Sequence, residues 1–379
     1  MISGNKGEWS ELYVLVKLLS DGVLYQADID LKKDHNNAYE IVKAFKNETD
    51  YTLEFQREDF LVVLKNNKII SQITFDELRT ITENLYQGIL KGKGRSFEIS
   101  EVKSFIDKAL IQKLKANSSQ KADIKLRIYD HRLAKETDLG FSIKSLLGGN
   151  STLFNTGKGN NFIFNVENNL DKSLDAFNQY TYSPPDNISK ISYRLKELKS
   201  LGAEFTFDTI QSSQLWRNLK MIDGDLPEIL AWALYYRWID REPALKNVVE
   251  KLEEYDPLNF YDGKYSIQRL YEYKLKRFLT EAAMGMTSET PWLGEYDSFG
   301  GVIMAKADGD VLCFHIYDFN IFRDYLLENT MFEQPSTSED PENPGYINPN
   351  SKKNYRYGWL YSEYDQLKFK INLQIRFIR

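Results

Sequence analysis

The sequence predicts a mixed α/β (α+β) protein in two parts, and three observations support this fold class. An amphipathic helix opens the chain, an alternating hairpin occupies residues 122–145, and a Pro-containing break at 183–187 precedes a mainly helical stretch. The 379 residues are enough for two domains. We therefore expect one part over residues 1–182 and a second part over 183–379.

The first part alternates helices and strands. Large apolar residues recur at helical spacing from Trp9 to Leu19, which predicts the opening helix. Its other expected elements are strands over 51–56 and 60–65, a helix over 76–90 with Asp76 near its N-cap, the hairpin, a loop over 148–160 and a strand over 161–166.

The second part begins as helices and ends as strands. Helical patterns are expected over 188–201, 214–221, 226–237, 243–255 and 266–283. Alternation then predicts strands over 301–305, 311–317 and 367–377. The segment 334–353 is rich in Pro, Ser, Asn and Glu, so we expect an exposed loop there.

Composition excludes several classes of protein. Only Cys313 is present, so neither an intrachain disulfide nor a thiolate zinc site is expected, and a cytoplasmic location fits. No apolar run approaches the roughly 20 residues of a membrane span, and no apolar leader is expected at the N-terminus. The net charge of −6 argues against a protein that coats nucleic acid indiscriminately.

The hairpin carries candidate catalytic residues. If its strands are 123–130 and 137–144, antiparallel pairing brings Asp123 beside Ser142 and Lys144, which share a face. Carboxylate-held Mg²⁺ and a lysine supply what phosphodiester hydrolysis needs: charge neutralisation, an activated water and a stabilised leaving oxygen. The same pattern also suits a half-solvated sheet edge, so spacing alone leaves both interpretations open.

Two other acids of the hairpin are expected to have no catalytic part. Asp130 and Asp138 lie at its turn end, away from Lys144, and are interpreted as turn residues.

This arrangement resembles the core of PD-(D/E)xK nucleases, in which an Asp opening one hairpin strand meets an acid-x-Lys near the end of the next. Ala122-Asp123 stands here in place of Pro-Asp, and Ser142-Ile143-Lys144 in place of acid-x-Lys. The usual second carboxylate is therefore missing, and a neutral serine replaces it poorly as a metal ligand. The resemblance implies a restriction-endonuclease-like core with a mixed central sheet, in which Asp123 holds Mg²⁺ and Lys144 activates the attacking water.

Longer stretches resemble the HpaII restriction endonuclease family in order and spacing. The stretches that carry this resemblance are Lys6-Gly-Glu-Trp-Ser-Glu-Leu-Tyr13, Gly140-Phe-Ser-Ile-Lys-Ser145, Leu147-Gly148, Ser151-Thr-Leu153, Met284-Gly-Met286, Trp292-Leu-Gly294 and 369–377. The resemblance implies a Mg²⁺-dependent type II restriction endonuclease that cuts double-stranded DNA at a short palindromic site, CCGG, and leaves a 5′-phosphate. A homodimer on DNA and a cytosine methyltransferase encoded nearby are implied as well.

Two glutamates are candidates for the missing ligand. Glu8 and Glu11 are three residues apart and share a face of the first helix. In nucleases of the resembled class, a glutamate from an early helix often supports the metal site. A favourable interaction of either acid with the helix N-terminus explains the pair equally well.

Candidate DNA contacts fall into two groups. Short polar residues beside the hairpin are candidates for phosphate contacts, although loop structure explains them nearly as well: Ser145, Thr152, Asn155 and Asn161. Basic residues of the C-terminal DNA-recognition region are candidates for base contacts: Lys306, Arg323 and Arg356. His315 is more simply interpreted as structural. Two other functions stay open: a repair or structure-specific PD-(D/E)xK nuclease, and a DNA-binding protein that has lost catalysis.

Overall fold

The computed structural model divides the chain into two compact units, each assembled from segments far apart in the sequence. The first unit combines Met1–Ser151 with Glu295–Tyr325, and the second combines Thr152–Gly294 with Leu326–Ile378. The described residues are 2–115, 122–132, 134–149, 151–167, 173–180, 187–264, 266–295, 300–334 and 357–378.

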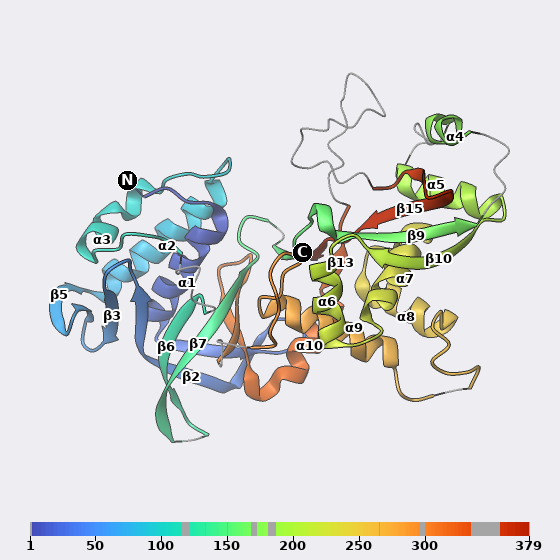
Figure 1. Ribbon diagram of the computed structural model, residues 1–379. Helices are drawn as coiled ribbons and strands as arrows, with labels where there is room; N and C mark the ends of the chain where they lie inside the picture. Colours follow the sequence, from blue (N-terminus) through green and yellow to red (C-terminus); the bar gives the residue numbers. More distant parts are fainter. Residues whose placement is uncertain are drawn as a thin grey trace. The chain divides into compact units, whose positions relative to one another are not determined.

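A mixed sheet forms the centre of the first unit (Figure 1). Its strands are β1 (Val23–Ala27), β2 (Lys33–Asn47), β3 (Thr52–Arg57), β4 (Leu61–Lys65), β5 (Lys68–Ile73), β6 (Ile124–Asp130), β7 (Lys135–Ser145), β11 (Gly301–Ala305) and β12 (Val311–His315). They follow the order β1-β12-β11-β7-β6-β2-β3-β4-β5. The pairs β1–β12 and β7–β11 are parallel and the others antiparallel. The predicted mixed α/β architecture is therefore confirmed.

An additional pairing joins β1 to β2, so β1, β12, β11, β7, β6 and β2 form a closed ring of hydrogen-bonded neighbours. The helices of this unit are α1 (Lys6–Asp21), α2 (Phe75–Lys91) and α3 (Lys103–Lys108), with short 3₁₀ turns at Ser100–Val102 and Ile316–Asp318. Helix α10 (Phe319–Glu328) begins in the first unit and ends in the second.

Helix α1 is fixed by caps at both ends. The Asn5 side chain accepts a hydrogen bond from Glu8 N at 3.0 Å, and the Glu8 carboxylate accepts one from Asn5 N at 2.9 Å, which is a capping box. At the other end Gly22 adopts φ +75°, and its N–H donates to Leu18 O at 2.9 Å. The first helix was thus predicted correctly.

The core of the first unit forms between α1, α2 and the sheet. Trp9, Leu12, Val16 and Leu19, which carry the helical periodicity, are all buried there. Each such side chain contributes about 1.5–3 kcal/mol relative to an exposed one. Figure 1 shows α1 and α2 side by side, and their residues contact one another.

The start of α2 agrees with the prediction that Asp76 lies near the N-cap. Thr74 is the N-cap, and its hydroxyl accepts a hydrogen bond from Glu77 N at 3.2 Å. Asp76 lies inside the first turn, where its charge interacts favourably with the helix dipole.

The hairpin was predicted correctly, although its second strand covers Lys135–Ser145 rather than 137–144. Ile124 of β6 pairs with Phe141 of β7, which sets Asp123 opposite Ser142. Strand β6 begins opposite Phe141, so the last residues of β7 extend beyond the first residue of β6. On the opposite edge of β7, these residues pair with β11. Met304 of β11 is the partner of Lys144.

In its described residues, the second unit contains six helices, two antiparallel sheets and the end of α10. The helices are α4 (Leu174–Tyr180), α5 (Lys190–Ser200), α6 (Ser213–Ile222), α7 (Leu226–Ile239), α8 (Leu245–Tyr255) and α9 (Leu270–Ala283). One sheet has the order β10-β9-β15-β14, and the other has the order β13-β16-β8. The strands are β8 (Thr152–Phe154), β9 (Asn161–Glu167), β10 (Glu204–Ile210), β13 (Thr330–Phe332), β14 (Leu360–Glu363), β15 (Gln366–Asn372) and β16 (Ile375–Phe377).

Three predicted elements need correction. The strand expected over 311–317 ends at His315, because the chain turns into a 3₁₀ helix there. The strand expected over 367–377 is two strands, because the chain leaves one sheet after Asn372 and enters the other at Ile375. The loop expected over 148–160 contains β8. The loop expected over 334–353 lies outside the described residues except for Gln334.

Among the helices of the described residues, none has both the length and the apolar character needed to cross a membrane.

Candidate active site

Asp123 lies immediately before β6 and is held against β7 by two hydrogen bonds. Its N–H donates to Phe141 O at 2.9 Å, and its carboxylate Oδ2 accepts from Ile143 N at 2.7 Å. The carboxylate therefore lies along the edge of β7, beyond the first residue pair that β7 forms with β6. The predicted neighbourhood of Asp123 and Ser142 is confirmed.

Lys144 shares its surroundings with two carboxylates. Burial lowers the pKa of Lys144, and the charges of Asp123 and Glu11 oppose that shift. Burial also raises the pKa of Asp123, against the hydrogen bond from Ile143 and the charge of Lys144. Burial favours the neutral form of each group, whereas the charge of the other group favours the charged form. We refer to Asp123, Glu11 and Lys144 as the acid–lysine cluster.

The structure separates the two glutamates of α1. Glu8 uses its carboxylate in the capping box, and that carboxylate lies 3.9 Å from the Lys115 ammonium. Glu11, almost one turn later, acts electrostatically on Lys144 and on Lys46. Glu11 therefore belongs to the acid–lysine cluster, whereas Glu8 stabilises the start of the helix.

Lys46 of β2 is a neighbour of this cluster that the sequence analysis missed. Its ammonium donates to Leu114 O at 3.1 Å and lies 3.8 Å from the Glu48 carboxylate, whose side chain is fully buried. Burial lowers the pKa of Lys46, and Glu48 and Glu11 oppose that shift. The Lys-x-Glu spacing at the end of β2 was the available signal, but nothing in it pointed to α1.

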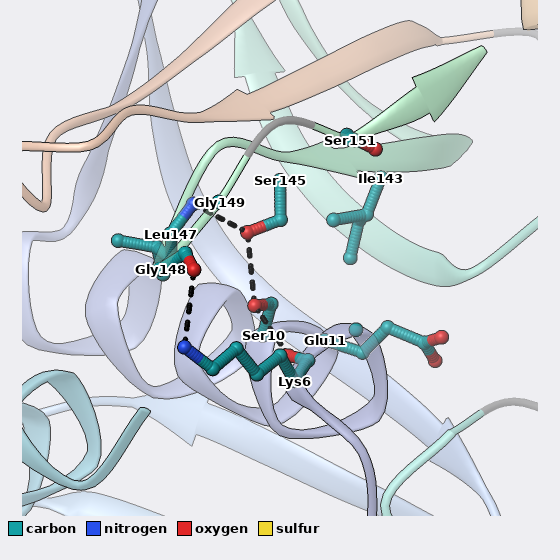
Figure 2. Close-up of a pocket in the computed structure, with 10 residues that line it drawn as sticks. Lys6, Ser10, Glu11, Ile143, Ser145, Leu147, Gly148, Gly149 and Ser151 are labelled. Atoms are coloured by element: carbon teal, nitrogen blue, oxygen red, sulfur yellow. Dashed lines mark hydrogen bonds between the residues drawn. The ribbon is translucent and has the colours of Figure 1, made fainter. Parts of the chain in front are cut away.

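A pocket of about 280 Å³ adjoins Glu11 (Figure 2). It is lined by the first turns of α1, the end of β7 and the loop that follows: Lys6, Gly7, Ser10, Glu11, Ile143, Ser145, Leu147, Gly148, Gly149 and Ser151. Figure 2 shows the Lys6 ammonium at one side, beneath Gly148, and the Glu11 carboxylate directed away from it. All of these residues belong to the first unit.

The donor set of the cluster suits a hard divalent cation. Asp123 and Glu11 offer carboxylate oxygens, which Mg²⁺ and Ca²⁺ prefer. Within the described ranges, no three His, Cys, Asp or Glu side chains come together as a metal site. Two protein carboxylates with water and substrate oxygens suit Mg²⁺, which usually keeps several waters and takes one or two carboxylates.

Ser142 and the remaining acids of the hairpin have structural surroundings. Ser142 is buried, and its hydroxyl is a neutral ligand at best. Asp138 binds Arg127 at 2.6 Å, and Asp130 accepts a hydrogen bond from Arg132 N at 2.9 Å. Asp130 therefore lies at the turn end of the hairpin, as predicted, whereas the interpretation of Asp138 as a turn residue was wrong, because it pairs with Arg127 in the middle of the two strands.

The candidate phosphate contacts are divided between the units. Ser145 lies in the pocket, where its hydroxyl donates to Ser10 Oγ at 2.9 Å. The other three lie in the second unit. Thr152 is in β8, and the carbonyl of Asn155 accepts a hydrogen bond from Asn160. Asn161 is fully buried and bonded to Gln211 and Asn372, so its amide serves the core.

The candidate base contacts include two side chains with protein surroundings. Lys306 pairs with Asp308 at 2.9 Å in the turn between β11 and β12. Arg323 lies in α10, and its Nε is buried with no hydrogen-bond partner among the described residues. Arg356 lies outside the described residues.

His315 has the surroundings of a core residue. It is buried and stacks on Tyr39 with ring centroids 4.8 Å apart. Its Nδ1 accepts a hydrogen bond from Tyr317 N at 3.3 Å, and burial lowers its pKa to about 4.

Comparison with known proteins points to one family. The chain matches the profile of the family described as HpaII restriction endonuclease over residues 5–377. It is 35% identical over 380 residues to the type II restriction enzyme HpaII of Haemophilus parainfluenzae, a match that covers 99% of each chain. No solved structure matches the chain.

Proposed function

The chain belongs to the HpaII restriction endonuclease family, and on that premise we propose that it cuts double-stranded DNA at CCGG with Mg²⁺, leaving 5′-phosphates. Membership makes it a type II site-specific deoxyribonuclease, an enzyme class that generally uses a divalent metal. The observation that supports the proposed mechanism is the acid–lysine cluster at the end of the hairpin.

Asp123 and Glu11 would hold the ion. The Asp123 carboxylate is fixed on β7 by its bond to Ile143, and the backbone of Glu11 is fixed in a capped helix, so both residues are placed before DNA binds. Bound there, Mg²⁺ would neutralise charge on the phosphoryl oxygens and stabilise the leaving oxygen.

Lys144 would position the attacking water and contact the scissile phosphate. Its pKa, lowered by burial, brings release of the ammonium proton closer to neutral pH, so the amine can take part in activating the water. In the protonated form the same group stabilises the developing negative charge. Ser142 contributes no charge, which leaves Glu11 as the second acid.

Target recognition and assembly follow from the proposed palindrome. A two-fold symmetric site favours a homodimer on DNA. Sedimentation of the protein–DNA complex tests this, and we expect two chains per duplex. We retain residues 1–182 as the catalytic part and 183–379 as the part that reads the target, with Lys306, Arg323 and Arg356 as candidates. A cytosine methyltransferase encoded nearby would protect the host DNA.

Mapping of the cut ends tests this function. A plasmid of known sequence is digested with Mg²⁺, and the fragment ends are sequenced and assayed for phosphate. The proposal predicts discrete fragments that all end at CCGG with 5′-phosphates. Discrete cuts at another sequence would reject the target, and a smear or nicks at junctions would indicate a different kind of nuclease.

A further inference from the structure

Lys6 is a cation with no carboxylate partner in the described part of the chain. Its ammonium donates one hydrogen bond, to Gly148 O at 3.0 Å, and lines the pocket beside Glu11. Lys17 of the same helix differs, because it pairs with Asp21 at 2.8 Å. Two N–H groups of the Lys6 ammonium therefore have no acceptor among the described residues.

Two of the three serine hydroxyls that line the pocket, those of Ser10 and Ser145, are already committed as donors. Ser145 Oγ donates to Ser10 Oγ at 2.9 Å, and Ser10 Oγ donates to Lys6 O at 2.7 Å. Ser145 Oγ also accepts from Leu147 N at 3.1 Å (Figure 2). These hydrogen bonds connect α1 to β7 and to the loop after β7. They fix the backbone at Lys6 and leave the Lys6 ammonium as the charged donor to a ligand.

The shape of the loop supports this placement of Lys6. Gly148 has φ +68°, and a Cβ there would lie 2.6 Å from the Lys6 ammonium. Any other residue would displace the lysine. A Cβ on Gly149 would meet nothing within 4 Å, so the rim beside Lys6 is bare backbone that a ligand can approach closely.

We propose that this pocket binds one DNA backbone phosphate next to the scissile phosphate, with Lys6 as its counter-ion. The inference rests on the proposed function. Glu11 lines the same pocket and belongs to the acid–lysine cluster, so an anion held by Lys6 lies beside the reaction centre. The lining has no aromatic side chain on which a base could stack, and glycine and serine make up most of it, which suits a phosphate rather than a base.

A chemical double-mutant cycle tests the contact. Duplexes containing the mapped site carry one uncharged methylphosphonate at successive positions around the cut, and affinities are measured with Ca²⁺ in place of Mg²⁺. Wild type should lose roughly tenfold in affinity at the position that Lys6 contacts. Lys6→Gln should bind unmodified DNA roughly tenfold more weakly and lose nothing further at that position, while it stays sensitive at the others.

Two further variants complete the test. Lys17→Gln removes the same charge from the same helix outside the pocket and should show the wild-type profile. Lys6→Arg keeps the charge, so its affinity should remain sensitive to the methylphosphonate at the position that Lys6 contacts. This variant therefore tests the contact even if Lys6→Gln folds poorly.

If the loss of affinity caused by Lys6→Gln adds to the loss caused by the methylphosphonate at every position, Lys6 contacts none of these phosphates and the proposal is wrong. In that case cleavage by wild type would leave the proposed function standing. Failure of wild type to cut any DNA would remove both proposals.

Discussion

The acid–lysine cluster joins residues that are predictable from sequence to different degrees. Asp123 and Lys144 were predicted together, because strand alternation and antiparallel pairing fix which side chains meet in a hairpin. Glu8 and Glu11 could not be separated, because both lie on one helix face. What separates them is the capping box with Asn5, which occupies Glu8 and leaves Glu11 to act on Lys144.

The metal dependence of glutamine variants tests this distinction. Glu11→Gln removes a proposed ligand and should raise the Mg²⁺ concentration for half-maximal cleavage by roughly tenfold or more. Glu8→Gln is the matched control, because glutamine at this position also completes a capping box, so its titration should match wild type. A shift caused by Glu8→Gln and not by Glu11→Gln would reverse the assignment.

His315 gives the first unit a pH-dependent contribution to stability. Burial lowers its pKa to about 4, below the value of about 6.5 in an unfolded chain. Between these values the unfolded chain binds a proton that the folded chain does not, so stability is lost as the pH falls from about 6.5 toward 4. The loss between pH 7 and pH 5 is about 2 kcal/mol.

Urea unfolding at pH 7 and pH 5 measures this contribution. His315→Gln removes the titrating group, so its loss of unfolding free energy on acidification should be about 2 kcal/mol smaller than that of wild type. Equal losses in the two proteins would show that His315 is not buried in its neutral form.

Local elements were easier to predict than the pairing of distant ones. The hairpin β6–β7 and helix α1 follow from short-range periodicity. Strand β2 was missed, because its first half is polar and lacks an apolar repeat. The position of β11 beside β7 depends on pairing between residues 160 positions apart (Phe141 and Gly301), which periodicity does not encode. That pairing sets Met304 beside Lys144 and so supports the cluster.

The N-terminal cap of α1 should contribute measurably to the free energy of unfolding. Asn5→Ala removes the acceptor for Glu8 N and should lower the free energy of unfolding by about 1 kcal/mol. Asn84→Ala, inside α2, makes the same chemical change where no cap is lost and should be neutral or slightly stabilising, because alanine favours helix. Equal destabilisation in thermal melts would remove the stabilising role given to the capping box.

For the whole molecule, sequence similarity was more informative than local pattern. The predicted functional parts, 1–182 and 183–379, are continuous segments, whereas the compact units divide the chain after Ser151, Gly294 and Tyr325. The difference arises because β11 and β12 return to the first sheet from a late part of the chain. Family membership, by contrast, rests on similarity over nearly the full length, and it fixes the class of reaction.

The acid–lysine cluster, as we propose, is the catalytic centre of this deoxyribonuclease. Asp123→Asn keeps an oxygen acceptor for Ile143 N but removes the charge of a proposed metal ligand. Asp138→Asn is the matched control on the same hairpin, because Asp138 pairs with Arg127 in the middle of the strands and is not part of the acid–lysine cluster.

Single-turnover cleavage of a duplex carrying the mapped site, at saturating protein and fixed Mg²⁺, tests the claim most directly. Asp123→Asn should bind this duplex as wild type does but cleave it more than about a hundredfold more slowly, since even groups that only support metal ligands contribute 10- to 100-fold. Asp138→Asn should cleave at the wild-type rate. Cleavage by Asp123→Asn at the wild-type rate would contradict the account.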